Sequence, residues 1–380
     1  MQEFSFRTRI FFGEGALEGL RRVKNRRVLI VTDRFMVEAG VPDKLTGYLE
    51  GCQVSVFADV KPDPPVEVVA QGVAALRESG AQVMIAVGGG SVIDAAKIIR
   101  AAAYAMPEGQ RQEVEECYAI PTTSGTGSEV TEYAVISDAQ KGVKYPLASE
   151  ELQPPIAILD PALVMSAPPR VTADTGMDVL THALEAYVST GANDFSDALA
   201  EKAVSLVFRF LPLAYQDGTD LLAREKMHNA SCMAGLAFNS AGLGVCHGIA
   251  HTIGGKFHIP HGRANAMVLP WVLQYNADLD HARSGAYSKA AKKYQRMAKI
   301  ADLPAYNVRI GVSNLVRAVQ DLNRLLQIPS TLKAHGIDPR EAEALKAEMV
   351  QAALQDGTTA TNPRPVSEAD VLKIIQKTIS

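Results

Sequence analysis

The amino-acid sequence predicts an α/β domain over residues 1–168 and an all-helical domain over residues 169–380. Three observations lead to this prediction. The length of 380 residues allows two domains, because a domain holds about 150 residues on average. In the first part, short apolar runs alternate with helical periodicity, which indicates a parallel or mixed sheet covered on both faces. After Pro168-Pro169 the Val- and Ile-rich runs largely disappear, and helical periodicity continues toward the C-terminus.

Strands of the first domain are expected where apolar residues follow one another without alternation, as in strands buried on both faces. Arg27–Thr32 has this pattern, and a helix-like stretch follows to Leu49. The same pattern gives strands over 53–57, 81–87, 117–121 and 156–160. Between these strands, residues 66–79 have helical period with Glu and Arg on the outer face. In the second domain, helices are expected over 172–189, 196–215, 221–237, 241–254 and most of 282–380.

The composition excludes several classes of protein. Hydrophobic residues make up 47% and charged residues 21%, which is not the composition of a disordered chain. The net charge is −4 and the charges are scattered, so we expect no positively charged patch that would bind nucleic acid or an anionic membrane. Four distant cysteines do not suggest a disulfide framework, and neither a signal sequence nor a membrane-spanning run is evident. We therefore expect a soluble cytoplasmic protein whose partners are small molecules and its own copies.

A glycine turn connects the third expected strand to a helix. Gly88-Gly89-Gly90-Ser91 follows Val87, and we expect these glycines to adopt positive φ and to let the backbone approach a diphosphate. The helix that begins there would offer its free N–H groups and positive dipole end to the anion. Taken alone, such a turn is as often only a tight connection.

A second loop has the composition of a dinucleotide site. Residues 121–129, PTTSGTGSE, follow a strand and are expected to precede a helix; their hydroxyl groups, on Thr122, Thr123, Thr126 and Ser128, suit a ribose, a diphosphate or a nicotinamide amide. Asp33, at the end of another strand, could bind ribose hydroxyls and would repel a 2′-phosphate, although it is equally suited to cap a helix. Together these strand ends predict a dinucleotide site that favours NAD over NADP.

The second domain contains the residue types of a metal site. Asp178 and His182 are four apart, and so are His247 and His251, a spacing that places each pair on one face of a helix. His258 and His261 follow shortly afterwards. One carboxylate with three imidazoles suits a divalent cation such as Fe²⁺ or Zn²⁺.

The two halves together predict hydride transfer between a nicotinamide and a carbon whose oxygen is polarised by the metal. A histidine that does not bind the metal could relay the proton to solvent, and His251 lies one helical turn from His247. Apolar residues near the metal motifs (Phe238, Val245, Ile249 and Ile253) favour short aliphatic substrates.

The chain resembles the iron-dependent (group III) alcohol dehydrogenases over essentially its whole length. The order and spacing of GGGS, PTTSGTGSE, GMDVLTHALEAY and HGIAH…HIPHGRANA carry the resemblance. It implies an α/β dinucleotide-binding domain, a helical metal-binding domain and assembly as dimers or larger. It implies Fe²⁺, or sometimes Zn²⁺, bound by Asp178, His182, His247 and His261, with His251 as a nearby residue that is not a ligand. For the dinucleotide it implies Asp33, Gly89, Gly90, Ser91, Asp94, Thr122, Thr123 and Lys144.

Within this family, VISDAQKGVKYPL and GMDVLTHALEAYVS are most similar to the propanol dehydrogenases of 1,2-propanediol-utilising microcompartments. This resemblance implies reduction of a short aldehyde with NADH, and shell proteins as further partners. Three alternatives remain. A glycerol-dehydrogenase-like enzyme would use fewer histidine ligands, and a dehydroquinate-synthase-like lyase would need more basic residues near the metal than Lys256 and Arg263. An inactive structural partner would not require the intact ligand set.

Overall fold

The computed structural model describes residues 4–138, 143–282 and 286–380, and only the backbone of residues 143 and 144. The contacts between residues divide the chain into two compact units. One comprises Ser5–Ala167, and the other comprises Pro168–Ser380 together with Phe4, which stacks on Phe195 with ring centroids 5.1 Å apart.

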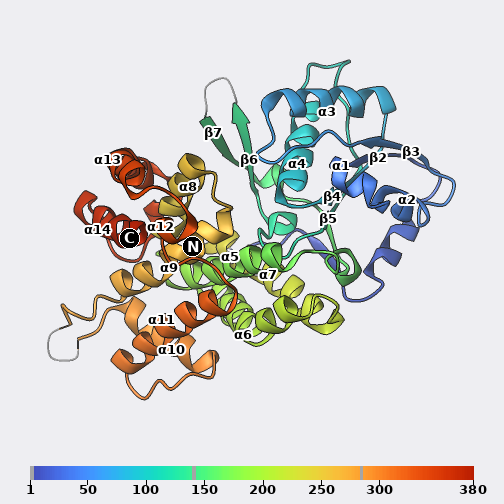
Figure 1. Ribbon diagram of the computed structural model, residues 1–380. Coiled ribbons are helices and arrows are strands. Elements are labelled where there is room, and N and C mark those ends of the chain that lie inside the picture. The colour runs from blue at the N-terminus through green and yellow to red at the C-terminus, as the bar shows by residue number, and fades with distance from the viewer. Residues whose placement is uncertain (1–3, 139–142, 283–285) are drawn as a thin grey trace. The chain divides into compact units, whose positions relative to one another are not determined.

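A six-stranded sheet forms the centre of the first unit (Figure 1). All of its strand pairs are parallel, and the strand order is β1-β8-β5-β4-β2-β3. The strands are β1 (Arg9–Phe12), β2 (Arg27–Val31), β3 (Gln53–Phe57), β4 (Val83–Gly88), β5 (Glu116–Pro121) and β8 (Ile156–Leu159). The predicted α/β class is therefore confirmed, and β1 is the strand that the sequence pattern did not reveal.

Both faces of the sheet are covered, which explains the unbroken apolar runs of its central strands. On β2, Leu29 and Val31 pack against α3 (Val66–Ser79) and α4 (Gly90–Tyr104). The alternate residues of β2, Val28 and Ile30, pack on the opposite face against a 3₁₀ turn over Ala16–Arg22 and against α2 (Val41–Thr46). Alternate side chains thus contribute to two cores that share one sheet.

The strand order reverses direction between β2 and β4. From β2 the chain moves outward to β3, then returns past β2 to β4 and continues to β5 on the other side. In open parallel sheets, ligands bind outside the carboxyl ends of the strands at such a switch point. Asp33 follows β2, and Gly89 follows β4, so both residues flank the position that the topology favours.

One predicted helix of the first unit is wrong, and another is divided into two. The loop over residues 121–129 leads into a three-residue 3₁₀ turn, Ser128–Val130, and then into the hairpin of β6 (Tyr133–Asp138) and β7 (Val143–Ala148). The helix-like stretch to Leu49 is divided into α1 (Arg34–Glu38) and α2, because Gly40 adopts a left-handed conformation, with φ of 71°. Such a residue ends one helix and redirects the chain before the next.

The second unit is helical in the part that the structure describes, as predicted (Figure 1). Its helices are α5 (Pro169–Val188), α6 (Asp194–Gln216), α7 (Leu221–Ala241), α8 (Val245–Phe257), α9 (His261–Ala277), α10 (Lys289–Ile300), α11 (Val308–Leu325), α12 (Leu332–His335), α13 (Pro339–Gln355) and α14 (Glu368–Ile379). They enclose one large hydrophobic cluster. The sequence pattern did not identify α9.

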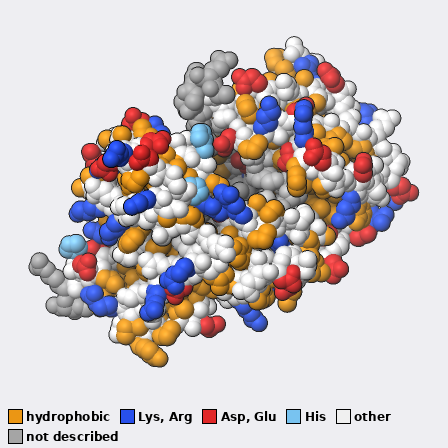
Figure 2. Space-filling view, in the orientation of Figure 1, with side chains coloured by type: hydrophobic (Ala, Val, Ile, Leu, Met, Phe, Trp, Pro, Cys, Tyr) orange, Lys and Arg blue, Asp and Glu red, His pale blue; other side chains and the backbone are white. Residues whose placement is uncertain are grey.

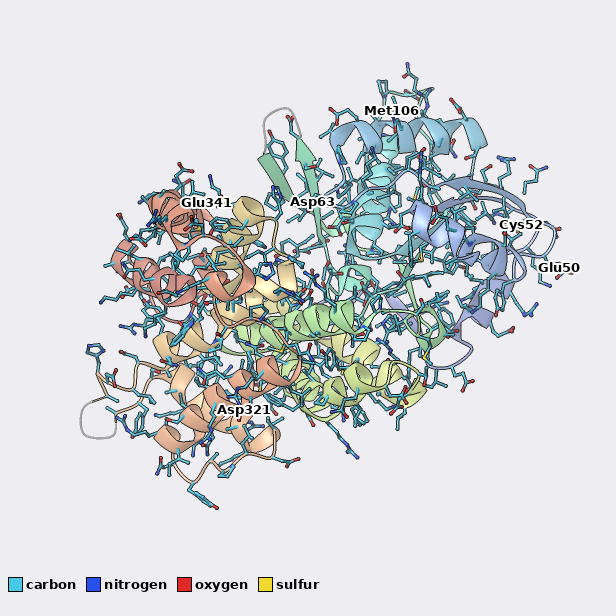
Figure 3. The ribbon with its side chains drawn as sticks, in the orientation of Figure 1. Glu50, Cys52, Asp63, Met106, Asp321 and Glu341 are labelled. Carbon is cyan, nitrogen blue, oxygen red and sulfur yellow. The ribbon has the colours of Figure 1, made fainter. Side chains whose placement is uncertain are left out.

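The surface is consistent with the small net charge. Acidic and basic side chains are interspersed over the face shown in Figure 2. All four cysteines are free, and Cys52 lies just before β3 (Figure 3). Among the described helices, none alone has the length and apolarity needed to span a membrane; α7 and α8 do so only as a pair bent by 111°.

Candidate active site

Helix α4 begins with an N-terminus that no side chain caps in the described part of the chain. Its N-cap is Gly89, and the next residue is Gly90. A Cβ on Gly90 would lie 2.8 Å from Cγ2 of Thr126, so the absence of a side chain lets the second loop pack against the helix start. The expected positive φ of the glycines is wrong: Gly89 has φ of −72°, and Gly88 and Gly90 also lie outside the left-handed region. Gly88 and Gly90 are therefore required by space rather than by conformation.

The hydroxyl-rich loop lies directly beside this helix start. The backbone N–H of Thr122 donates to the carbonyl of Gly88 at 3.0 Å, which aligns the two strand ends. A Cβ on Gly89 would be 3.7 Å from the Thr123 hydroxyl, an ordinary contact distance. The structure therefore brings together the predicted residues Gly89, Gly90, Ser91, Thr122, Thr123 and Thr126.

Asp94 and Ser128, also predicted to bind the cofactor, are paired with each other. The Ser128 hydroxyl donates to Asp94 Oδ1 at 2.5 Å, and the backbone N–H of Val135 donates to Oδ2 at 3.0 Å. Burial raises the pKa of the Asp94 carboxyl. Asp94 thus joins α4 to the loop and to β6, which supports a bracing role beside the predicted binding role.

Lys97, one turn further along α4, is buried under the same loop. Its ammonium donates to the carbonyl of Tyr133 at 2.7 Å and to the Thr131 hydroxyl at 3.2 Å. Burial lowers the pKa of Lys97 to about 8, against the attraction of nearby acidic groups. Burial also raises the pKa of Glu129 to about 7. Lys97 therefore joins α4 to the residues that follow the loop, a role that the sequence did not reveal.

Asp33 lies after β2 and caps α1. Its Oδ1 accepts a hydrogen bond from the backbone N–H of Met36 at 2.9 Å. The capping role that the sequence allowed is therefore present, and the predicted ribose contact stays a prediction. Lys144 lies on β7 opposite Ser137, and its side chain is outside the described part of the structure.

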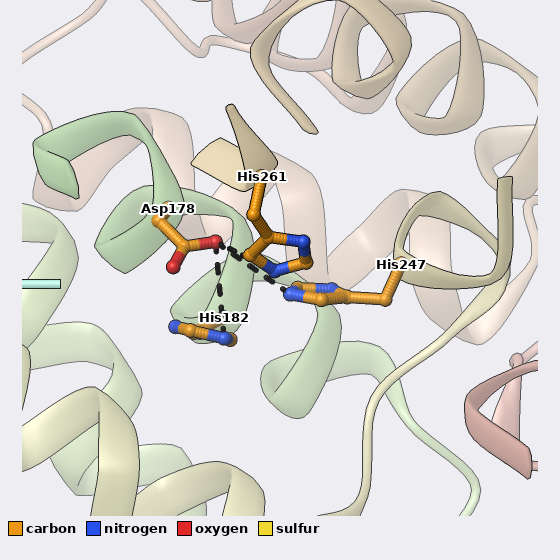
Figure 4. Close-up of side chains that lie close together, drawn as sticks. All are labelled: Asp178, His182, His247 and His261. Carbon is orange, nitrogen blue, oxygen red and sulfur yellow. Dashed lines mark ion pairs between the residues drawn. The ribbon is translucent and has the colours of Figure 1, made fainter. Parts of the chain in front are cut away.

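The second unit gathers the four predicted metal ligands at one point (Figure 4). Asp178 Oδ1 lies 3.3 Å from Nε2 of His261, 3.8 Å from Nε2 of His247 and 3.9 Å from Nε2 of His182. All four ligand atoms lie within 4.8 Å of one another. Atoms that bind one Zn²⁺-sized ion tetrahedrally at the usual bond lengths are about 3.3–3.6 Å apart, so this spacing suits a common ion.

Three helices contribute these ligands. Asp178 and His182 stack one turn apart on α5, His247 lies in the first turn of α8, and His261 begins α9. The start of α9 packs tightly on α5: a Cβ on Gly262 would lie 1.9 Å from the carbonyl oxygen of Asp174. A glycine after His261 thus allows the approach that brings this imidazole to Asp178.

The electrostatics of the cluster fit a cation. Burial alone would raise the pKa of Asp178, but the surrounding imidazoles outweigh it and hold this pKa well below its usual value. Desolvation within the cluster lowers the pKa of His261 to about 3, which leaves a neutral imidazole that can act as a ligand. In His247, burial is outweighed by the nearby carboxylates of Asp178 and Glu185, which raise its pKa to about 9.

The contacts of Asn265 show whether the cluster fits a metal. Its amide nitrogen lies 2.9 Å from Asp178 Oδ1, 3.2 Å from His247 Nε2 and 3.1 Å from His261 Nε2. An amide has only two hydrogens for these three acceptors. Its own oxygen is buried without a hydrogen-bond partner among the described residues. Lone pairs therefore exceed donors at this point, which is the arrangement that a cation satisfies.

His251 lies beside the cluster but outside the group of four. Its ring centroid is 5.2 Å from that of His261, and its side chain is 43% exposed. Nδ1 of His251 lies 2.7 Å from Oδ2 of Asp356, and Oδ1 of Asp356 accepts from the backbone N–H and hydroxyl of Thr358. Asp356 is thus held rigidly and orients the imidazole.

Sequence reasoning missed three polar partners of this cluster. Asn265 follows His261 by four residues on α9, so helical spacing could have revealed it. Glu185 lies in the motif GMDVLTHALEAY, but the sequence analysis assigned it no role. Asp356 is 105 residues from His251, and no local sequence pattern connects the two. Of the apolar residues expected near the substrate, Phe238 lies against His182 with ring centroids 4.5 Å apart. The other three, Val245, Ile249 and Ile253, belong to the hydrophobic core.

The profile described as iron-containing alcohol dehydrogenase matches residues 7–161, and the profile of the C-terminal part of the Fe-containing alcohol dehydrogenase family matches residues 172–379. The chain belongs to the iron-containing alcohol dehydrogenase family. The resemblance found in the sequence is therefore confirmed, and so is the expected function of a metal-dependent alcohol dehydrogenase linked to a nicotinamide cofactor.

Individual relatives support the same conclusion. The chain is 46% identical over 384 residues to the 1-propanol dehydrogenase PduQ of Citrobacter freundii, covering 99% of this chain and 100% of that protein. It is 38% identical over 391 residues to an NADPH-dependent butanol dehydrogenase of Clostridium saccharobutylicum, covering 99% and 97%. The crystal structure of a 1,3-propanediol oxidoreductase aligns over 100% of both chains, with 33% identity and a TM-score of 0.88.

Proposed function

We propose that this enzyme interconverts short-chain aldehydes and primary alcohols, such as propionaldehyde and 1-propanol, with NAD(H) and Fe²⁺, or Zn²⁺ in its place. The observation that carries the proposal is the convergence of Asp178, His182, His247 and His261 on one point. Identity to a 1-propanol dehydrogenase over the whole chain supports the substrate class.

In the proposed reaction, the bound cation, NAD(H) and the residues of the protein have separate roles. When bound, the cation would act as a Lewis acid on the substrate oxygen, and NAD(H) would carry the hydride. The four ligand residues would hold the cation, with Asp178 supplying the one negative charge among three neutral rings. His251, which is partly exposed and oriented by Asp356, would move the proton between the substrate oxygen and solvent.

The cofactor is assigned to the switch point of the sheet. We infer that the uncapped start of α4, with Gly89, Gly90 and Ser91, binds the diphosphate, and that Thr122, Thr123, Thr126, Ser128, Asp94 and Lys144 contribute to the same site. Asp33 would favour NAD, because its carboxylate would repel a 2′-phosphate. A relative named as NADPH-dependent makes this preference worth measuring rather than assuming.

We also propose that the two domains bind different groups: residues 1–168 bind the dinucleotide, and residues 169–380 bind the metal. The enzyme would assemble as a homodimer or larger in the cytoplasm. The sequence resemblance to propanol dehydrogenases of microcompartments supports encapsulation with shell proteins. Co-fractionation with purified shells tests this last point, and recovery of the enzyme only in the soluble fraction would contradict it.

The decisive experiment measures NADH oxidation by propionaldehyde without oxygen. Protein stripped of metal is supplied separately with Fe²⁺ and with Zn²⁺, and each activity is compared with that of the stripped protein. Restoration by either ion supports the proposal and identifies the preferred metal. Activity only with polyols, or tight NADH binding without aldehyde reduction under either ion, would contradict it.

A further inference from the structure

Helix α8, which carries His247, begins with a glycine and is capped by side chains from elsewhere in the chain. Its N-cap, Gly244, provides no side-chain hydrogen bond. The backbone N–H of Val245 instead donates to Oδ1 of Asn362 at 3.2 Å, and that of Cys246 donates to Oε1 of Glu185 at 2.7 Å. A Cβ on Gly244 would lie 2.7 Å from the same Glu185 oxygen, so glycine is needed for this approach.

Glu185 also contacts the imidazole of His247. Its Oε2 lies 2.5 Å from Nδ1 of His247, and the Glu185 side chain is only 2% exposed. The opposite ring nitrogen, Nε2, lies 3.8 Å from Asp178 Oδ1 and is the atom that joins the metal cluster. One carboxylate therefore contacts the ring from the side remote from the cluster. Glu185 follows His182 by three residues on α5, so the helix that supplies two ligands also supplies this contact.

We propose that Glu185 is a positioning residue of the metal centre: it holds His247 with Nδ1 protonated and Nε2 directed at the cation, and it places a second buried negative charge behind the ring. This inference rests on the proposed function. A carboxylate that accepts the N–H of a metal-binding histidine fixes its tautomer and increases its basicity, and its removal costs about 10- to 100-fold in metal affinity.

The simplest competing explanation is that Glu185 only caps α8. Asn362 provides a matched control, because it caps the same helix end and contacts neither His247 nor the other ligands in the described structure. A capping residue stabilises the fold by about 0.5–2 kcal/mol and has no separate effect on a metal. The two explanations therefore differ in metal affinity rather than in stability.

The experiment compares Glu185→Gln and Asn362→Ala with the wild type in the full-length protein. Zn²⁺ affinity is measured by competition with a chromophoric chelator, and thermal unfolding is measured on the metal-free proteins. We expect E185Q to bind Zn²⁺ about 10- to 100-fold more weakly, because Gln keeps an acceptor but loses the charge. N362A should unfold at a lower temperature and bind Zn²⁺ with unchanged affinity.

A second pair of variants tests whether Glu185 acts through His247. In a His247→Ala background, E185Q should weaken Zn²⁺ binding no further. If E185Q does not fold, Glu185→Asp retains the charge at a shorter reach and should bind Zn²⁺ more weakly than the wild type. Wild-type affinity in the folded Glu185 variant would overturn the proposal while leaving the proposed function intact. Failure of the wild type to bind one Zn²⁺ per chain would overturn both.

Discussion

Helices α4 and α8 both begin at a glycine that supplies no side-chain cap, but they differ in whether other side chains accept hydrogen bonds from their first backbone N–H groups. At α8, Glu185 and Asn362 reach in from other elements and accept the first N–H groups. At α4, no side chain in the described structure does so. A helix start that the protein caps itself stabilises the fold, whereas one left uncapped remains available to an external anion.

The two regions also use side chains differently. The metal cluster needs particular side chains, because ligand atoms must converge on one point. In the proposed dinucleotide region, the start of α4 has no side-chain cap, and two of the motif residues, Asp94 and Ser128, bond to each other. A motif residue near a metal therefore tends to be a ligand, while one near a phosphate loop can equally be its support.

Removing a metal ligand should have the largest effect. His261→Ala deletes one of four ligands at a partly exposed position, so the fold should survive while aldehyde reduction falls by at least about 10³-fold. NADH binding, followed by fluorescence titration, should change little. The matched control is His281→Ala, an exposed histidine outside the cluster, which should retain wild-type activity. Equal loss of NADH binding and activity in H261A would show that the two regions are not separable.

Asp356→Asn should have the next largest effect. The variant keeps an acceptor for Thr358 but loses the charge that orients His251. We expect kcat to fall by about 10- to 100-fold with little change in the KM for aldehyde, because proton transfer is affected and binding is not. Steady-state kinetics at saturating NADH provide the measurement. An unchanged kcat would remove His251 and Asp356 from the proposed proton path.

Gly90→Ala tests the dinucleotide region in the same way. The added Cβ would meet Thr126 at 2.8 Å and push the loop away from the helix start. We expect a loss of about 1–3 kcal/mol in unfolding free energy and about tenfold weaker NADH binding, with unchanged affinity for Zn²⁺. Calorimetry of both ligands checks this. Weaker Zn²⁺ binding in G90A would contradict the independence of the two regions.

Lys97 predicts a pH dependence of stability. Burial lowers its pKa from 10.5 to about 8 in the folded protein, so between these pH values the unfolded chain binds more protons. Raising the pH from 8 to 10 should therefore stabilise the wild type relative to Lys97→Met, by about 2 kcal/mol. Urea unfolding of both proteins at several pH values measures the difference. A difference that does not vary with pH would mean that burial does not lower the pKa of Lys97 in the folded protein.

Asp33→Asn should have the smallest effect on the fold. Asn preserves the cap of α1, so the melting temperature should stay within a few degrees of the wild type. The ratio of kcat/KM for NADH over NADPH should decrease, because the charge that repels a 2′-phosphate is lost. An unchanged ratio would leave Asp33 with a capping role alone.

The α/β class and most strands could be predicted, because periodicity along the chain reflects them directly. Spacing indicated the pairs Asp178/His182 and His247/His251, whereas the proposed set of four metal ligands, with His261, came from the family resemblance. The apolar run of β2 and the four-residue spacing of Asp178 and His182 are local signals. The hairpin of β6 and β7 was missed because the Ser/Thr/Gly loop before it resembles the start of a helix.

Other features depend on the tertiary fold. No local pattern connects Asp356 to His251 or Asn362 to α8, since each pair is more than a hundred residues apart. The space requirement at Gly262 likewise arises only when α9 packs on α5. Such features require the folded chain, whereas the ligands themselves do not.

The position of Asp356 and Asn362 near the C-terminus has a consequence for the order of synthesis. A nascent chain is made from the N-terminus, so His247 and His251 are synthesised more than a hundred residues before Asp356, which orients His251, and Asn362, one of the two groups that cap α8. The metal centre is therefore incomplete on a growing polypeptide. A product that terminates before residue 356 would carry Asp178, His182, His247 and His261 without Asp356 and Asn362, which orient His251 and cap α8.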